Sequence, residues 1–359
     1  MRYKLKDLVA LKYGKSQKSV EDNENGKYPI LGTGGIIGYA KEPLYNKPSV
    51  LIGRKGTIDK IRYVDSPFWT IDTLFYTEIN TDLINPQYLY YRLLDVDFKN
   101  LNEGTTIPSL RTQTLYEIEL EIDDIQTQNK IVDILATIDK KIKQNTHTNN
   151  NLLEFMNFKF NNWINTLNNY TISALSNIAT YTNGLAMQNF RPQNEKGLPV
   201  IKIKEMHDGL SDNTERCSSL IKKEYIVNNG DVLFAWSGTL CMAIWSQGKA
   251  GLNQHIFKVN SEVYPKWFYY LWTKKHLDKF IEIAAGKATT MGHIKRKELD
   301  LAEVKIPTKE ELLKADKVFS PLLEKYIKNG IENETLKKIR DTLLPKLMNG
   351  EIDLDRVEI

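Results

Sequence analysis

The chain has few of the residues that build disulfide frameworks or metal sites. Its 359 residues include two cysteines, Cys217 and Cys241, which are too few for a disulfide framework and are typical of a protein in a reducing compartment. The five histidines show no H-E-x-x-H spacing, and no C-x-x-C pair occurs. The sequence therefore predicts no metal site.

Long apolar runs and a strong excess of one charge are also missing. No run approaches the roughly 18 apolar residues of a membrane span, and the first residues do not resemble a signal peptide. Lys and Arg number 49 against 45 Asp and Glu, so bulk charge alone does not predict nucleic-acid binding. We expect a cytoplasmic protein with no membrane partner, long enough for two domains.

Motifs for nucleotide chemistry are incomplete. No G-x-x-x-x-G-K-[ST] loop occurs, and none of the twelve prolines precedes Asp. The Gly-rich segment 32–38 has its third glycine one place too late for a dinucleotide fingerprint, which favours a turn-rich loop. Residues 85–88 (Asn-Pro-Gln-Tyr) resemble the Asn-Pro-Pro-Tyr loop of adenine-N6 DNA methyltransferases, but the second proline is missing. Such an enzyme stays open as an alternative.

What the chain does contain is a long internal repeat. Residues 49–57 (Ser-Val-Leu-Ile-Gly-Arg-Lys-Gly-Thr) return 182 positions later as 231–239, and 105–110 return 184 positions later as 289–294. Pro86, which precedes a pair of tyrosines, is echoed by Pro265. One long unit used twice predicts two similar modules with a pseudo-two-fold relation.

Short apolar runs bounded by Gly, Pro or Asp, such as 50–52 and 74–76, predict buried strands. Pro86 is expected in the first turn of a helix. The fold class is therefore α/β (or α+β), with two modules separated by two long helices. The expected boundaries are 1–124 for the first module, 125–168 for a central helix, 169–307 for the second module, and 308–359 for a C-terminal helix and tail.

Each module is followed by a stretch with heptad spacing. Because apolar residues alternate four and three apart, each helix should have a partner, and we expect the two to pair as an antiparallel coiled coil. Asparagines occupy matching seam positions, where they either fix the register or mark a polar break; Gly330 favours the break. The predicted seam residues are Ile131, Leu135, Ile138, Ile142, Asn145, Asn149, Leu152, Phe319, Leu322, Tyr326, Asn329, Asn333 and Leu336.

Gly/Thr loops that end in basic residues, at 104–111 and 286–297, are suited to phosphates, since small hydroxyls and backbone N–H groups approach closely and cations neutralise charge. The polar side chains at equivalent positions differ between the two copies of the repeat. Such differences are expected of two modules that recognise different base sequences. The candidate DNA-binding residues are Lys15, Thr33, Arg54, Lys55, Thr57, Thr105, Thr106, Arg111, Trp236, Ser237, Thr239, Asn253, His255, Lys287, Thr289, Thr290, His293 and Lys295.

These features together resemble the specificity (S) subunit of type I restriction-modification enzymes over essentially the full length. The resemblance is carried by segments 5–8, 28–39, 49–57, 106–110 and 126–142. The second module departs from it, with Met-Gly-His-Ile at 291–294 in place of the Ile-Pro-x-Leu form.

The resemblance implies a non-catalytic subunit with two target-recognition domains, each reading one half of a split site in double-stranded DNA. It implies that the helices set the gap between the half-sites and dock two methyltransferase (M) subunits. No cofactor would bind this chain: S-adenosylmethionine would belong to the M subunits, and ATP with Mg to restriction (R) subunits where these join. A recognition subunit of a type IIG-like restriction system would look similar, and a two-domain scaffold with no DNA role is a further alternative.

Overall fold

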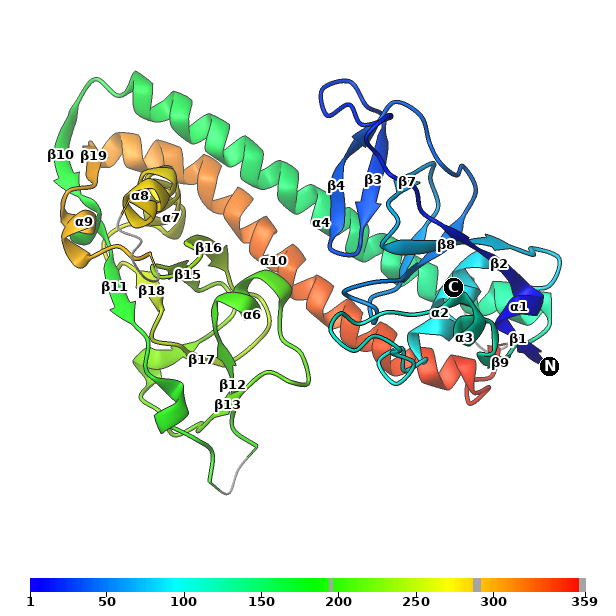
Figure 1. Cartoon of the computed structure of the whole chain (residues 1–359). Coiled ribbons are helices and arrows are strands. Elements are labelled where there is room, and N and C mark those ends of the chain that lie inside the picture. The colour runs from blue at the N-terminus through cyan, green and yellow to red at the C-terminus, as the bar shows by residue number, and fades with distance from the viewer. Residues whose placement is uncertain (194–195, 287–291, 355–359) are drawn as a thin grey trace. The chain divides into compact units, whose positions relative to one another are not determined.

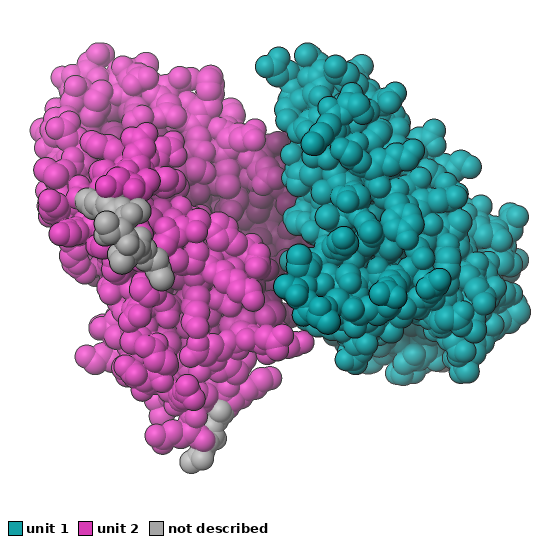
Figure 2. All heavy atoms as spheres, viewed as in Figure 1, with its two compact units in different colours: residues 1–139, 339–359 teal, residues 140–338 magenta. Residues whose placement is uncertain are grey.

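The computed structural model describes residues 1–193, 196–286 and 292–354. The chain forms two compact units, coloured separately in Figure 2. Unit 1 contains Met1–Asp139 and Ile339–Ile359, and unit 2 contains Lys140–Lys338. The division falls inside two long helices, α4 (Ile125–Thr166) and α10 (Lys309–Met348), so each unit includes a segment of both.

Unit 1 is built around a four-stranded antiparallel sheet of order β2-β8-β5-β6. A smaller sheet has the order β4-β3-β7, with β3 and β7 parallel, and β1 pairs with β9. Three short helices, α1, α2 and α3, complete the unit (Figure 1). The bounds are β1 Arg2–Lys4, α1 Leu5–Leu8, β2 Val9–Tyr13, β3 Tyr28–Gly32, β4 Gly35–Ala40, β5 Ser49–Gly53, β6 Arg62–Val64, β7 Trp69–Thr70, β8 Leu74–Ile79, α2 Pro86–Leu94, α3 Thr112–Tyr116 and β9 Glu119–Glu121.

The core of unit 1 lies between the large sheet and α2. All five residues of β5 are buried, as its unbroken apolar run predicts for a central strand. Helix α2 begins with proline in its first turn, as the sequence predicts, and buries Tyr88, Leu89 and Tyr91. The side chain of Asn85 caps this helix by accepting hydrogen bonds from the backbone N–H groups of Gln87 (2.9 Å) and Tyr88 (3.3 Å).

Unit 2 repeats this plan. Its four-stranded antiparallel sheet has the order β11-β18-β15-β16, its second sheet the order β13-β12-β17-β14, and β10 pairs with β19. The bounds are β10 Tyr170–Ala174, α5 Leu175–Ile178, β11 Thr180–Asn183, η1 Met187–Asn189, β12 Leu198–Ile201, α6 Ile203–Asp208, β13 Arg216–Cys217, η2 Lys223–Tyr225, β14 Ile226–Val227, β15 Val232–Ala235, β16 Cys241–Ile244, β17 Ala250–Leu252, β18 Ile256–Asn260, α7 Lys266–Lys275, α8 Leu277–Ala285, α9 Arg296–Asp300 and β19 Glu303–Pro307.

The tandem repeat is thus confirmed at the level of topology. The two large sheets have corresponding strand orders, and the second sheet of each unit contains one parallel pair, β3 with β7 and β12 with β17. One detail differs from the sequence prediction: the segment 32–38 lies mostly in the β3–β4 hairpin rather than in a loop. Pro265, the counterpart of Pro86, is the residue before α7.

Helices α4 and α10 pair in antiparallel fashion, because contact positions on α4 rise as those on α10 fall. In unit 2, Asn145 contacts Glu332, Asn149 contacts Asn329, and Trp163 packs near Phe319. In unit 1, Asp139 contacts Arg340 at 3.0 Å. This is the antiparallel pairing that the heptad spacing predicts. None of the described helices is both long and apolar enough to cross a bilayer.

Candidate nucleic-acid interface

In unit 1, three segments meet where the central strand β5 ends. The backbone N–H of Arg54 donates to the carbonyl of Thr73 at 2.8 Å, and Leu110 N–H donates to the carbonyl of Arg54 at 2.9 Å. Gly56 N–H donates to the carbonyl of Pro108 at 2.9 Å. We call residues 54–57, 71–73 and 103–110 the unit 1 cradle. It is joined by backbone hydrogen bonds, so its shape depends little on the side chains it presents.

Unit 2 has the same arrangement where β15 ends. Trp236 N–H donates to the carbonyl of His255 at 3.2 Å, Ile294 N–H to that of Trp236 at 3.1 Å, and Gly238 N–H to that of Gly292 at 2.9 Å. Residues 236–239, 253–255 and 292–294 form the unit 2 cradle. Its hydrogen bonds match those of unit 1 residue for residue under the offsets of the sequence repeat.

The guanidinium group of Arg54 is held inside the unit 1 cradle. Its Nη1 donates to the carbonyl oxygen of Asp72 at 2.8 Å, and the group lies 5.1 Å from the centroid of the Tyr13 ring. The Asp72 carboxylate lies 4.0 Å away. At least one N–H donor of Arg54 is therefore already hydrogen-bonded within the protein.

The loop 103–110 presents small hydroxyl groups on a braced frame. The Asn102 carboxamide oxygen accepts from the backbone N–H groups of Gly104 and Ser109, both at 2.9 Å. A side chain at Gly104 would clash with the carbonyl of Ile107, because the backbone approaches to 1.9 Å of the added Cβ position. The loop residues Thr105, Thr106 and Ile107 are exposed.

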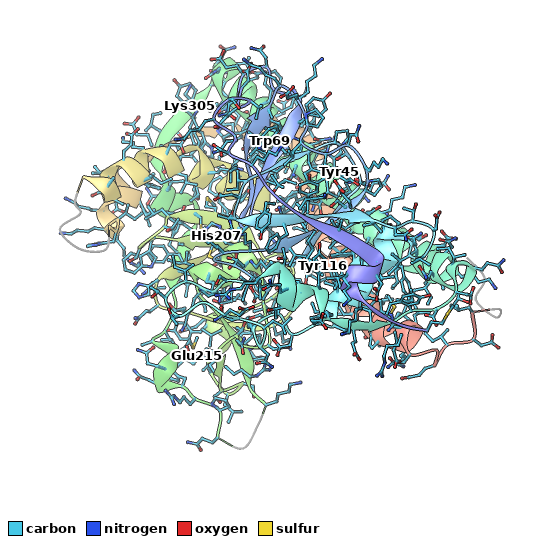
Figure 3. The ribbon with its side chains drawn as sticks, turned by 45° about the vertical axis from the view of Figure 1, so that its right-hand side comes forward. Tyr45, Trp69, Tyr116, His207, Glu215 and Lys305 are labelled. Carbon is cyan, nitrogen blue, oxygen red and sulfur yellow. The ribbon has the colours of Figure 1, made fainter. Side chains whose placement is uncertain are left out.

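The remaining candidates in unit 1 divide into two groups. Lys55 is exposed and Thr57 half-buried within the cradle, while Arg111 at its border pairs with Glu103 at 3.1 Å. Lys15 and Thr33 belong with the smaller sheet. The carbonyl of Lys15 accepts the indole N–H of Trp69 at 3.0 Å (Figure 3), and Thr33 lies in the turn between β3 and β4.

Aromatic rings fill the unit 2 cradle. The indole N–H of Trp236 donates to Asn183 Oδ1 at 2.8 Å, and its ring stacks on Phe257 with centroids 5.5 Å apart. The rings of His255 and His293 lie 6.2 and 6.4 Å from Trp236. This indole is thus a structural centre of the cradle, with its single donor already bound.

The other candidate DNA-binding residues of unit 2 differ in how deeply they are buried. Ser237 and Asn253 are buried, at 5% and 6% exposure, so the structure does not offer them to a ligand as the sequence had suggested. Thr239 and Lys295 are exposed. Lys287, Thr289 and Thr290 lie outside the described residues.

Sequence reasoning missed the side chains that hold the cradles together: Tyr13 and Asn102 in unit 1 and Asn183 in unit 2. Asn102 carries a detectable signal, since Asn two residues before Gly is typical of a side chain that bonds its own loop. Tyr13 and Asn183 carry none, because they reach the cradle from β2 and β11 only through sheet pairing.

The seam of the helix pair contains a polar stretch in unit 2. Asn329 Nδ2 donates to Asn149 Oδ1 at 2.9 Å, Asn149 Nδ2 donates to the carbonyl of Tyr326 at 3.0 Å, and Asn333 Nδ2 donates to Thr146 Oγ1 at 3.2 Å. Of the apolar seam residues predicted here, Phe319 is buried in the core of unit 2, and Leu152 is half-buried. Leu323 is buried at 3%, more deeply than the predicted Leu322.

In unit 1 the predicted seam residues have a second role. Ile131 and Leu135 are fully buried in the core of the unit together with Leu344 and Leu347 of α10. Ile138 is half-buried. In unit 2, Ile142, Tyr326 and Leu336 are half-buried as well. The spacing therefore identified an apolar face that packs on both a helix and a domain core.

The position of Asn85 argues against the adenine-methyltransferase alternative. Asn85 is committed to capping α2, and its Nδ2 also donates to Asn129 Oδ1 at 2.8 Å. Its side chain is therefore not presented to a base. Among the described residues, no three His, Cys, Asp or Glu side chains gather closely enough to hold a metal ion.

Comparison with known proteins agrees with this geometry. The family model described as type I restriction modification DNA specificity domain matches residues 1–154 and 168–341. The MjaIX specificity subunit of Methanocaldococcus jannaschii is 24% identical over 88% of this chain and 80% of its own length. The HindI specificity subunit of Haemophilus influenzae is 21% identical over 77% of this chain and 79% of its own.

The fold is also that of a solved relative. The crystal structure of a type I restriction-modification S subunit from M. genitalium superposes with a TM-score of 0.59 at 17% identity, covering 97% of this chain and 95% of that one. The family match covers most of the chain, in two stretches that follow the repeat. The chain therefore belongs to the type I restriction modification DNA specificity domain family, with the domain present twice in tandem.

Proposed function

We propose that this chain is the DNA sequence-specificity subunit of a type I restriction-modification system. One recognition domain, 1–124, reads one half of a split DNA site, and the other, 169–307, reads the second half. The observation that carries the proposal is the repetition of the cradle, with the same backbone hydrogen bonds, in two units that present different side chains. Two related domains that recognise two different short DNA sequences need a common backbone frame and different side chains.

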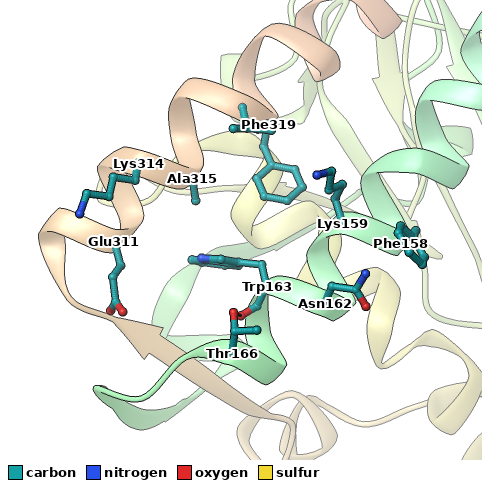
Figure 4. Close-up of a pocket in the computed structure, with 10 residues that line it drawn as sticks. Phe158, Lys159, Asn162, Trp163, Thr166, Glu311, Lys314, Ala315 and Phe319 are labelled. Atoms are coloured by element: carbon teal, nitrogen blue, oxygen red, sulfur yellow. Dashed lines mark hydrogen bonds between the residues drawn. The ribbon is translucent and has the colours of Figure 1, made fainter.

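We further propose that the helices dock two methyltransferase subunits. A groove of about 490 Å³ in unit 2 between the end of α4 and the start of α10 supports this (Figure 4). It is lined by Trp163 and Phe319, and at its rim Phe158 is 62% exposed. An apolar rim of this kind is typical of a protein–protein contact. Methyl transfer from S-adenosylmethionine, and ATP with Mg where restriction subunits join, would belong to these cytoplasmic partners.

The test is selection of a randomised DNA duplex library by the purified full-length chain. We expect enrichment of two short sequences separated by a fixed gap of unspecified bases. Affinity should fall steeply between 50 and 200 mM salt, because phosphate contacts release counterions. A single uninterrupted motif would contradict the two-domain proposal, and binding insensitive to salt would favour a scaffold with no DNA role.

The same preparation tests whether the chain is non-catalytic. Incubated with labelled S-adenosylmethionine and the selected duplex, the chain alone should transfer no methyl group. Addition of a methyltransferase subunit from the same system should restore transfer to adenine. Robust transfer by the chain alone would contradict the proposal that methyl transfer belongs to the methyltransferase subunits.

A further inference from the structure

The two cradles recur in both recognition units with the same backbone hydrogen bonds. The proposed half-sites differ in base sequence, and what they share is the sugar-phosphate backbone. A frame repeated hydrogen bond for hydrogen bond in both units is therefore suited to the backbone. Building on the proposed function, we propose that each cradle binds DNA phosphates regardless of sequence, while base reading belongs to the second sheet of each unit.

The side chains best able to read bases are occupied within the cradles. Arg54 donates to the Asp72 carbonyl and lies over Tyr13, and Arg111 pairs with Glu103. In unit 2 the indole N–H of Trp236 is bound to Asn183. Bidentate reading of guanine needs a guanidinium edge that faces the groove. The contacts of Arg54 take up part of its edge, and Glu103 pairs with the Nε of Arg111, whose side chain is 71% exposed.

The groups that the cradles expose are suited to phosphate. Lys55, Thr105 and Thr106 are exposed in the unit 1 cradle. Thr239 is exposed in the unit 2 cradle, and Lys295 is exposed directly after its last residue. A lysine is a flexible point charge with no planar fork, and a threonine hydroxyl donates equally well to any phosphate oxygen. At each cradle, or directly beside it, a cation and at least one small hydroxyl group are thus exposed, despite different side chains elsewhere.

A further equivalence supports a common ligand. Thr73 and His255 occupy the same repeat position, 182 residues apart. Among the described residues, Thr73 Oγ1 and His255 Nδ1 are both buried without a hydrogen-bond partner. A buried polar atom without a partner is costly, so its recurrence at one position indicates a partner that the chain alone does not supply. A phosphate oxygen at the cradle would be such a partner after a small rearrangement.

The second sheets, in contrast, differ between the units in backbone course, whereas the cradles share one backbone frame. In unit 1, β3 and β4 form a tight hairpin whose Ile36 and Ile37 are 59% and 48% exposed. In unit 2, the strands β12 and β13 are instead joined by a longer excursion that contains α6, with Lys204 and His207 exposed (His207 is labelled in Figure 3). A two-stranded ribbon and a helix are the two elements that fit the major groove, and apolar side chains contact the thymine methyl group there.

The experiment compares three variants of the full-length chain, using the randomised library and a scrambled-sequence duplex. Lys55→Gln with Thr106→Val alters the unit 1 cradle, Ile36→Ala with Ile37→Ala alters the hairpin, and Lys204→Gln with His207→Gln alters α6. Lys143→Gln, an exposed site on α4, is the matched control for loss of one charge. All changed side chains are exposed or at the surface, and thermal unfolding checks that each variant folds.

We expect the cradle variant to bind every duplex about three- to tenfold more weakly, with an unchanged selected motif and a salt slope lower by about 0.9 for the lost lysine contact. The hairpin and α6 variants should keep their affinity for the scrambled duplex but each lose base preference, by about tenfold or more, in one half of the motif. Lys143→Gln should change neither property.

Several results would overturn the inference while leaving the proposed function intact. One is a cradle variant that selects different bases at undiminished non-specific affinity. Another is a pair of hairpin and α6 variants that select the wild-type motif unchanged. A wild-type chain that selects no motif and whose binding ignores salt would instead overturn the proposed function, and this inference with it.

Discussion

His276 is a half-buried titratable residue whose surroundings penalise its charged form. Its ring lies between Trp272 and Phe280, with centroids 6.2 and 6.0 Å away, and Nε2 contacts the carbonyl of Glu303 at 2.9 Å. Burial, aided by the charges of Lys275 and Lys279, lowers the pKa of His276 below its ordinary value of 6.5.

The consequence is a loss of stability in acid. As the pH falls below about 6.5, the unfolded chain takes up a proton that the folded imidazole resists, so the free energy of unfolding decreases. We expect His276→Gln to flatten this dependence between pH 7.5 and 5.5, measured by denaturant midpoints. Asn150→Gln, a non-titrating change at an exposed position on α4, is the control and should keep the wild-type slope. An unchanged slope for His276→Gln would contradict the assignment.

At the scale of single residues, the sequence predicted positions better than it predicted roles. The repeat located Arg54 and Trp236 at equivalent places, and both lie in the cradles. Their partners Tyr13 and Asn183 come from distant strands, and no local pattern encodes that approach. Burial of Ser237 likewise depends on packing that only the folded unit supplies.

At the scale of elements, one buried residue of the helix seam, Asn333, lowers the stability of the helix pair. Asn333 is 8% exposed, its Nδ2 makes a long bond of 3.2 Å to Thr146, and its Oδ1 has no partner among the described residues. Thr146 keeps a bond of 2.8 Å to the carbonyl of Ile142. Replacing the asparagine with an apolar side chain therefore removes an unpaired acceptor and leaves Thr146 satisfied.

We expect Asn333→Leu to raise the free energy of unfolding by about 1 kcal/mol. Chemical denaturation measures this, with Asn150→Leu as the matched control: Asn150 is exposed on α4, and its replacement should stay within about 0.5 kcal/mol of wild type. A destabilised Asn333→Leu chain would show that the asparagine contributes net stability to the helix pair rather than register alone.

Helices with a strong period were the most predictable elements, and Gly-rich segments the least. The heptad spacing predicted the paired face of α4 and α10 even across Gly330, which the structure explains by the close approach of Ser246, 3.1 Å from an added Cβ. Segment 32–38 offers no clear alternation because four of its seven residues are glycine. Its hairpin is instead defined by pairing of β4 with β3.

At the scale of the whole molecule, the duplication makes spacing and reading separable properties. One cradle lies within each unit, whereas α4 and α10 are the elements that both units share. Under the proposed function, lengthening these helices should change the gap of the DNA site and leave both half-site sequences as they were.

The antiparallel pairing dictates how such an insertion must be made. Seven residues added to α4 alone would move Asn149 away from Asn329 and break the seam in unit 2. Seven residues added after Asp139, together with seven before Ile339, keep every pairing on both sides, because Asp139 and Arg340 lie opposite each other. A heptad also preserves the phase of the apolar face.

Seven residues add about 10 Å of helix, which corresponds to about three base pairs of duplex. We therefore expect library selection with the paired insertion to recover the two wild-type half-sites with a gap about three base pairs longer. The single insertion in α4 serves as the comparison and should lower the thermal unfolding temperature without selecting a clean new gap. If the paired insertion selects the original gap, the helices do not set the spacing, and an element within the units must do so.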